Sequence, residues 1–191
     1  MIDLLPGTFG TTPTFGNTFD RSVARAIQWF TATRDQYGRW HDAPVNHAVL
    51  YVGEVPGYDQ PQIVEAAPGG ANFSDWNAYG TDMVWAHEVE GVTLNDQQRA
   101  SIAQFGIDCA IKGVGYGYLD FVAIALAQRR MHSIVFYEHT QWWAKRLGDP
   151  HRLICSQLVD WCYLQADVHL FSDGRWPGLV SPADLRALTL G

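Results

Sequence analysis

The chain has 191 residues, of which 47% are hydrophobic and 17% charged, a balance that favours one folded domain over residues 1–191 rather than a disordered chain. The net charge of −7 provides no basic surface for nucleic acid or an anionic membrane. No apolar run reaches the ~18 residues that cross a bilayer, and Met1–Pro6 lacks the basic and apolar regions of a signal peptide. We therefore expect a soluble, cytoplasmic protein without a transmembrane segment, with a phage origin or export by a non-Sec route as alternatives.

The first half of the chain predicts a helix followed by a β-hairpin. Residues 1–20 are rich in Gly, Thr, Pro and Phe and predict an irregular or short-strand segment. Asp20 can cap a helix over Phe19–Arg34, after which 35–46 form a polar loop. The β-rich runs His47–Gly53 and Gln62–Ala67 then predict two antiparallel strands joined by a short loop.

One acidic residue stands out in this hairpin. Glu65 lies in the middle of a short apolar strand, where a carboxylate costs free energy unless it finds a partner. Side chains alternate across a strand, so His47, Val49 and Tyr51 share one face of the preceding strand. We expect His47 to be the partner of Glu65.

The second half alternates between loops and helices. The sequence predicts a surface loop at 71–82, a third strand at 83–89 and helices at 97–112, 119–130 and 136–147. A turn at 173–178 precedes a last short helix, which Ser181 caps with Pro182 at its first position.

Three glycines around 113–117 do not predict a phosphate-binding loop. Gly113, Gly115 and Gly117 follow a predicted helix and lack the Gly-Lys-Ser/Thr ending of such a loop. Apart from His47, the histidines are expected to be ordinary surface or core residues, because their spacings form neither HExxH nor a zinc pattern. They are His41, His87, His132, His139, His151 and His169.

The three cysteines form no disulfide framework, because the count is odd and there is no CxxC pair. This fits a reducing compartment or a free reactive thiol. The stretch 152–162 predicts a buried helix with Cys155 in its first turn, because Leu158, Val159 and Cys162 recur at helical spacing. A helix N-terminus favours a thiolate and directs N–H donors at an oxyanion. Cys155 is therefore a candidate nucleophile, the alternative being a small buried residue. Cys109 and Cys162 are expected to pack in the core.

Cys155, His47 and Glu65 supply the three roles of a nucleophilic site. A histidine can deprotonate the thiol and later protonate the leaving group, while an acid orients the imidazole. The alternatives are a structural strand histidine and a carboxylate that only forms an ion pair.

The order of these residues resembles the circularly permuted branch of the NlpC/P60 (papain-like) superfamily, which includes the YiiX/YaeF-type proteins. There a motif like HVGIYVG comes first, a strand ending in an EA pair second and a CSELV helix last. The matching segments here are His47–Gly53, Val64–Ala66 and Cys155–Val159, with softer matches at 115–118 and 181–185. The chain departs from the pattern in its long loop before His47 and in Ala48, where the family usually has valine.

The resemblance implies an α+β, papain-like fold in which the cysteine helix packs on an antiparallel sheet. It implies Cys155 as nucleophile, His47 as general base and acid, and Glu65 as the orienting group, although superfamily members vary in this third residue. Tyr51 and Tyr116 are candidates for the substrate cleft. Trp142 and Trp143 could form a substrate wall, although packing is the default for such residues.

The implied activity is that of a cysteine hydrolase, which cleaves a peptide or peptidoglycan stem amide through a thioester. No metal or organic cofactor is implied. One alternative is a lipid acyltransferase or thioesterase on the same fold, acting on an acyl substrate. The other is a binding or structural module without catalysis.

Overall fold

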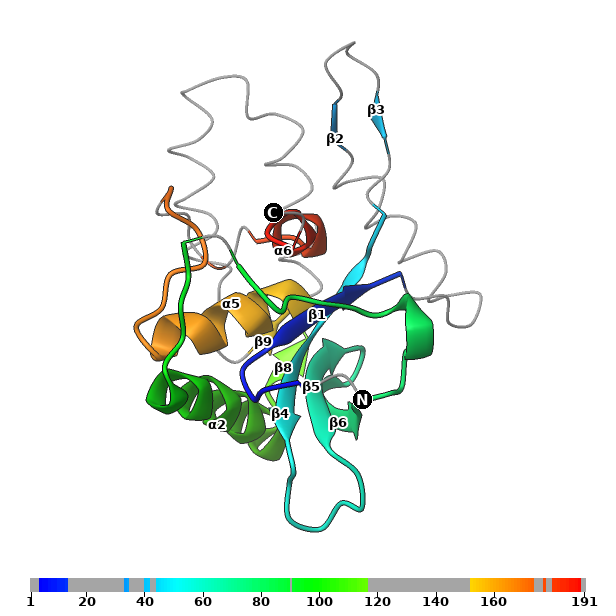
Figure 1. Cartoon of the computed structure of the whole chain (residues 1–191). Coiled ribbons are helices and arrows are strands. Elements are labelled where there is room, and N and C mark those ends of the chain that lie inside the picture. The colour runs from blue at the N-terminus through cyan, green and yellow to red at the C-terminus, as the bar shows by residue number, and fades with distance from the viewer. Residues whose placement is uncertain are drawn as a thin grey trace.

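The described part of the chain has an α+β architecture, as the sequence predicts. The computed structural model describes residues 4–13, 33–34, 40–41, 44–89, 91–116, 152–173, 177 and 180–189. Within these ranges, two main helices lie against one face of a five-stranded antiparallel sheet (Figure 1). None of the helices in the described ranges is both long and apolar enough to cross a membrane.

The central strand of the sheet carries the first candidate residue, His47. The strand order is β6-β5-β4-β1-β7, and every neighbouring pair is antiparallel. The strands are β1 (Phe9–Thr12), β4 (His47–Gly53), β5 (Gln62–Ala67), β6 (Gly70–Asp75) and β7 (Val84–Trp85). β4 therefore lies between β1 and β5, which confirms the predicted hairpin of β4 and β5 and the short strand predicted near the N-terminus.

Smaller elements surround this sheet. A 3₁₀ turn η1 (Gly80–Asp82) follows β6, and β2 (Thr33–Arg34) pairs with β3 (Trp40–His41). β8 (Gly115–Tyr116) runs parallel to β9 (Arg152–Leu153), which leads directly to the segment before Cys155.

Helix α2 (Asp96–Lys112) is capped at both ends. The Asn95 side chain accepts from the Gln98 N–H at 2.8 Å, and the Gln98 side chain accepts from the Asn95 N–H at 3.1 Å. Gly113 ends the helix in the left-handed region with φ of 63°, a conformation that glycine adopts easily. The helix predicted at 97–112 is confirmed.

Helices α5 (Cys155–Gln165) and α6 (Pro182–Ala187) also confirm their predictions. α5 begins with Cys155 in its first turn. α6 begins after Ser181, whose hydroxyl accepts from the Asp184 N–H at 3.2 Å, with Pro182 at the first helical position. α6 contacts α5, β1 and β4.

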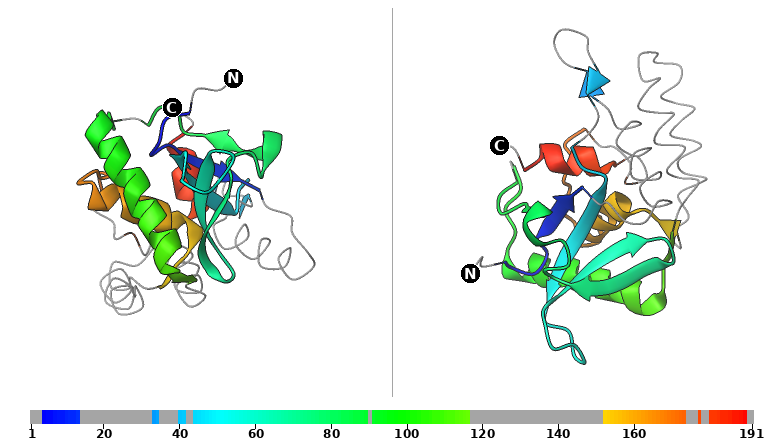
Figure 2. Two further views of the ribbon diagram at one scale, coloured as in Figure 1. Left: turned by 90° about the horizontal axis from the view of Figure 1, so that it is seen from below. Right: turned by 90° about the vertical axis from the view of Figure 1, so that its right-hand side faces the viewer.

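The main core lies between the helices and one face of β4. Ala48, Leu50 and Val52 alternate along this face and pack in one buried cluster with Leu158 of α5. Gly106 lets α2 approach closely, because a Cβ at this position would lie 2.8 Å from Leu50 Cδ2. Figure 2 shows α2 and α5 together on this side of the sheet. The core therefore fixes α5, and with it Cys155, relative to β4.

The opposite face carries a smaller cluster, which we call the aromatic cluster. Its buried centre is Val49, Ile63 and Met83, and half-buried aromatic side chains pack around it. These aromatic residues are Tyr51, Trp76, Tyr79 and Trp85. Because His47, Val49 and Tyr51 alternate with the core residues of β4, the aromatic cluster lies on the His47 face.

The loop predicted at 71–82 is wrong in its first half, because Gly70–Asp75 forms strand β6. Asn72 is exposed and Ser74 half-buried, so the segment has the polar composition of a loop. β5 nevertheless pairs with it from Ala67↔Gly70 to Gln62↔Asp75, across the tight turn at Pro68 and Gly69. Pairing on a sheet edge overrides the weak strand propensity of these residues.

Other predictions differ in part or cannot be compared. The strand predicted at 83–89 is limited to β7, which pairs with only two residues of β1. Thr33–Arg34, predicted as a helix end, form β2, and Trp40–His41, predicted as loop, form β3. The remainder of the first predicted helix, the helices predicted at 119–130 and 136–147, and most of the turn at 173–178 lie outside the described residues.

Gly69 and Gly70 offer a matched test of the contact that ties β6 to the chain before β8. Both have a positive φ, 116° and 113°, but a Cβ on Gly70 would lie 2.7 Å from the Val114 carbonyl oxygen, whereas nothing lies within 4 Å of one on Gly69. We expect Gly70→Ala to lower the free energy of unfolding by about 1–3 kcal/mol more than Gly69→Ala, as measured by urea denaturation. Equal losses in the two variants would contradict this close approach.

Candidate active site

Cys155 is the first residue of α5 and is 2% exposed. Two contacts hold this turn in place. The Ile154 N–H donates to Gln157 Oε1 at 3.0 Å, and the Ser156 hydroxyl donates to the Val180 carbonyl at 2.7 Å. The cap residue Ile154 has no side-chain acceptor, so its side chain does not cap the first N–H groups of the helix. The buried start of α5 therefore combines a thiol with the positive end of a helix.

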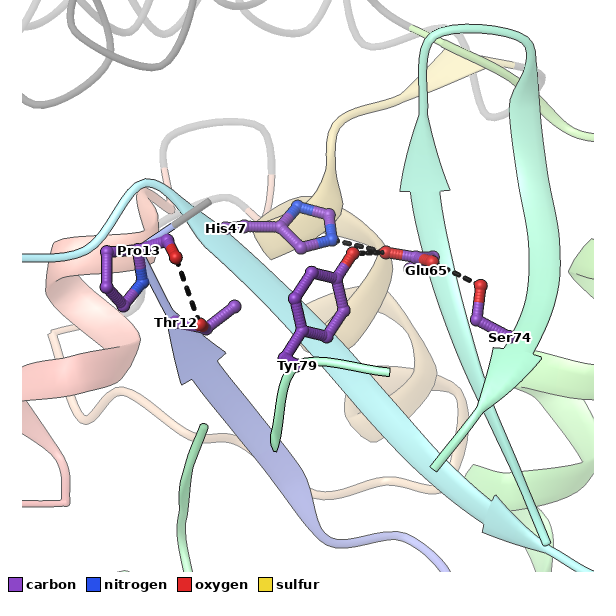
Figure 3. Close-up of polar contacts among 6 residues, drawn as sticks. All are labelled: Thr12, Pro13, His47, Glu65, Ser74 and Tyr79. Atoms are coloured by element: carbon purple, nitrogen blue, oxygen red, sulfur yellow. Dashed lines mark hydrogen bonds and ion pairs between the residues drawn. The ribbon is translucent and has the colours of Figure 1, made fainter. Parts of the chain in front are cut away.

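His47 and Glu65 come from neighbouring strands and share a face. In the register of β4 and β5, Tyr51 lies opposite Ile63. Because side chains alternate, His47 lies on the face of Tyr51, and Glu65 lies on the face of Ile63. His47 Nε2 is 2.6 Å from Glu65 Oε2, and both side chains are almost fully buried (Figure 3). The contact predicted from the sequence is confirmed.

Two further side chains bind the Glu65 carboxylate, and the sequence analysis missed both. The Ser74 hydroxyl of β6 donates to Oε1, and the Tyr79 hydroxyl donates to Oε2 (Figure 3). The Tyr79 ring also lies against the imidazole, with ring centroids 5.6 Å apart. Ser74 lies opposite Ile63 and therefore on the same face of the sheet as Glu65. Side-chain alternation would have predicted this if the segment had been recognised as a strand.

These contacts keep Glu65 ionised. Burial alone would raise its pKa, but the hydrogen bond and charge of His47, together with the hydrogen bonds from Ser74 and Tyr79, lower the pKa of Glu65 to about 2. Burial, followed by the charge of Glu65, raises the pKa of Tyr79, so the phenol keeps its proton and donates. The site therefore holds a carboxylate with three hydrogen-bond donors.

Cys155 lies next to this pair. Burial alone would lower the pKa of His47, but the negative charge of the Cys155 sulfur, hydrogen bonds to Cys155 and Glu65, and the charge of Glu65 raise it to about 10. Since Nε2 contacts Glu65, Nδ1 is the nitrogen available to the thiol. The structure thus brings together the nucleophile, base and acid positions inferred from the sequence.

The two candidate cleft residues lie in different clusters. Tyr51 belongs to the aromatic cluster, where its ring meets Trp85 edge-on with centroids 6.1 Å apart. Tyr116 packs against the main core and pairs with Leu153, just before Cys155. Their role in substrate binding remains a prediction. Trp142 and Trp143 lie outside the described residues.

Cys109 and Cys162 pack as predicted. Cys162 is fully buried in the main core, and Cys109 is half-buried against it. A hydrogen bond between the two thiols raises the pKa of Cys162 and lowers that of Cys109. His87 and His169 are exposed. Within the described ranges, no group of three or more His, Cys, Asp or Glu side chains could hold a metal ion.

Comparisons of the chain with protein-family models, with curated proteins and with solved structures found no match. The assignment of this site therefore depends on its own geometry.

The pKa of Glu65 predicts a pH dependence of stability. Because this pKa falls from 4.5 to about 2 on folding, Glu65 stabilises the fold above about pH 4.5, and this contribution disappears as the pH falls towards about 2. We expect the stability difference between the native protein and Glu65→Gln to shrink over this interval by roughly 2–3 kcal/mol, as measured by urea unfolding at several pH values.

Glu54→Gln, in the exposed β4–β5 loop, is the matched control for this experiment. It should unfold in parallel with the native protein at every pH. Curves for Glu65→Gln that also stayed parallel would show that the carboxylate is not held as an anion.

Proposed function

We propose that the protein is a cysteine hydrolase that cleaves an amide bond through a thioester on Cys155. The observation that carries this proposal is the position of His47, which contacts Glu65 through Nε2 and also forms a hydrogen bond with Cys155. His47 and Glu65 come from the hairpin of β4 and β5, and Cys155 comes from α5, much later in the sequence. A thiol, an imidazole and an oriented carboxylate in this arrangement are the components of nucleophilic acyl transfer.

The first half of the reaction forms the acyl-enzyme. With the thiol proton already on His47 Nδ1, the Cys155 sulfur attacks the carbonyl carbon of the substrate. The tetrahedral intermediate then collapses, the C–N bond breaks, and the imidazolium returns the proton to the departing amine. The products of this half are a free amine and a thioester on Cys155.

The second half releases the acyl group from Cys155. Water attacks the thioester carbonyl while His47 accepts one of its protons, and the C–S bond breaks. The carboxylic acid leaves, and the proton taken from water stays on His47 Nδ1 beside the released sulfur. Glu65 holds the Nε2 proton throughout, so Nδ1 remains the nitrogen that exchanges protons with sulfur, water and amine.

The start of α5 supports the oxyanion of both intermediates. Its first N–H groups have no partner within the helix, and Ile154 carries no side-chain acceptor for them. N–H donors and the positive end of a helix stabilise a negative oxygen that forms beside the sulfur. This role needs no side chain beyond Cys155 itself.

The arrangement supports a papain-like fold similar to the circularly permuted branch of the NlpC/P60 superfamily. A helix begins with the cysteine and packs against an antiparallel sheet, the histidine begins the central strand, and the acid lies on the next strand. The order histidine, acid, cysteine is that of the permuted branch. The resemblance makes a peptide or a peptidoglycan stem peptide the substrate that we propose.

A lipid acyltransferase or thioesterase is the second candidate, and the aromatic cluster favours it. Tyr79 of this cluster contacts both His47 and Glu65, so the packed aromatic side chains extend to the site. Incubation with a peptidyl thioester and with a fatty-acyl thioester of the same thiol separates the two functions, because both compounds carry the same reactive bond. The compound that acylates Cys155 faster, as seen by intact mass spectrometry, identifies the substrate class.

Alkylation by iodoacetamide tests the proposed nucleophile. We expect Cys155 to be labelled at about pH 6.5 and the rate to fall at least about tenfold in His47→Ala, because the imidazole no longer takes the thiol proton. Peptide mass spectrometry locates the label. His169→Ala, which changes an exposed histidine, is the control and should leave the rate unchanged.

Cys109 and Cys162 provide an internal reference in the same samples. Because the pKa of Cys109 is lowered, Cys109 can be labelled without being a nucleophile of the site. The decisive result is therefore whether the labelling rate of a cysteine depends on His47. If Cys155 were labelled equally in native protein and His47→Ala, the hydrolase proposal would be wrong. A non-catalytic binding module, which the burial of Cys155 favours, would replace it.

A further inference from the structure

The Glu65 carboxylate is held by more donors than the orientation of one histidine requires. Oε2 accepts from His47 Nε2 and from the Tyr79 hydroxyl, and Oε1 accepts from Ser74. The carboxylate of a glutamate rotates easily, because its terminal torsion is broad. Donors on both oxygens remove this freedom and fix the direction in which Oε2 faces His47.

Tyr79 is placed to act on the whole site. It lies in the turn between β6 and η1, and its hydroxyl reaches the carboxylate oxygen that His47 also contacts. Its ring is tilted against the imidazole by 53° at a centroid distance of 5.6 Å (Figure 3). The charge of the Cys155 sulfur also acts on the phenol, so Tyr79 lies near the nucleophile as well.

We propose that Tyr79 is a positioning residue of this site, which holds Glu65 through its hydroxyl and one side of the His47 ring through its own ring. Ser74 holds the second carboxylate oxygen. The inference rests on the proposed hydrolase function, because positioning matters only if His47 exchanges protons with Cys155.

The physical effect of Tyr79 has two parts. Its hydrogen bond stabilises the carboxylate anion, which keeps the proton between Glu65 and His47 on Nε2. Its ring fills the space beside the imidazole and opposes rotation of His47, so Nδ1 stays available to the sulfur. A merely structural tyrosine would contribute packing but would leave the proton affinity of Glu65 and the reactivity of Cys155 unchanged.

Tyr79→Phe separates these roles, because it removes the hydroxyl and keeps the ring. We expect the pKa of Glu65 to rise by about one unit or more, since a hydrogen bond to the anion is lost. The measurement is a ¹³C NMR titration of the native protein and of the Tyr79→Phe variant, each labelled at glutamate Cδ. Tyr58→Phe, which makes the same change at an exposed tyrosine, is the control and should not move the pKa of Glu65.

Ser74→Ala is a second variant that acts on the other carboxylate oxygen. It should also raise the pKa of Glu65, and if Tyr79→Phe does not fold it still tests whether hydrogen bonds hold this carboxylate. Circular dichroism and urea unfolding establish folding before either titration. An unchanged pKa of Glu65 in the folded Tyr79→Phe variant would overturn the inference.

The reactivity of Cys155 provides the second readout. In Tyr79→Phe we expect the iodoacetamide rate at about pH 7 to fall several-fold, because His47 is less well oriented. A raised pKa of Glu65 with an unchanged rate would show that the hydrogen bond of Tyr79 has no effect on the nucleophile, and it would overturn the inference. If Cys155 of the native protein is unreactive, the proposed function fails, and the Glu65 titration then decides alone whether Tyr79 holds the carboxylate.

Discussion

The buried carboxylate of Glu65 is the constraint on which the site depends. It is 5% exposed in the middle of strand β5, where an isolated charge would be strongly unfavourable. Partners from β4, from β6 and from the turn after β6 satisfy it. The same contacts join three strands at one place and determine which nitrogen of His47 faces the carboxylate. A stability requirement of the hairpin thereby determines the direction of proton transfer in the proposed reaction.

Core packing supplies the other half of the site. α5 is held against β4 by a hydrophobic cluster that includes Leu50 and Leu158, and it meets α2 on the same face of the sheet. Hydrogen bonds from Ile154 and Ser156 fix the first turn. Cys155 consequently reaches His47 without a flexible connection. The charged pair and the apolar core thus have separate tasks: one sets the chemistry of the imidazole, and the other places the sulfur.

The parts of the site that the sequence predicts are those governed by local rules. The contact of His47 with Glu65 is predicted by the alternation of side chains in the first strand and by the cost of an unpaired acid in the second. The spacing of apolar residues predicts the helix that begins at Cys155. Ser74 and Tyr79 could not be found in this way, because Asn72, Ser74 and Asp75 have the composition of a loop. Their strand exists through pairing with β5, and Tyr79 reaches Glu65 only because that hairpin brings the following turn back over the sheet.

The most direct test of this account is ¹⁵N NMR of His47 in protein labelled at histidine, recorded at about pH 7 for native protein and Cys155→Ala. Because the charge of the sulfur contributes to the raised pKa of His47, the account predicts an imidazolium protonated on both nitrogens in the native protein. In Cys155→Ala the pKa should fall, and any neutral ring should carry its proton on Nε2, facing Glu65. A neutral His47 in the native protein with its proton on Nδ1 would contradict the central claim, because Nδ1 could not then accept the proton of Cys155.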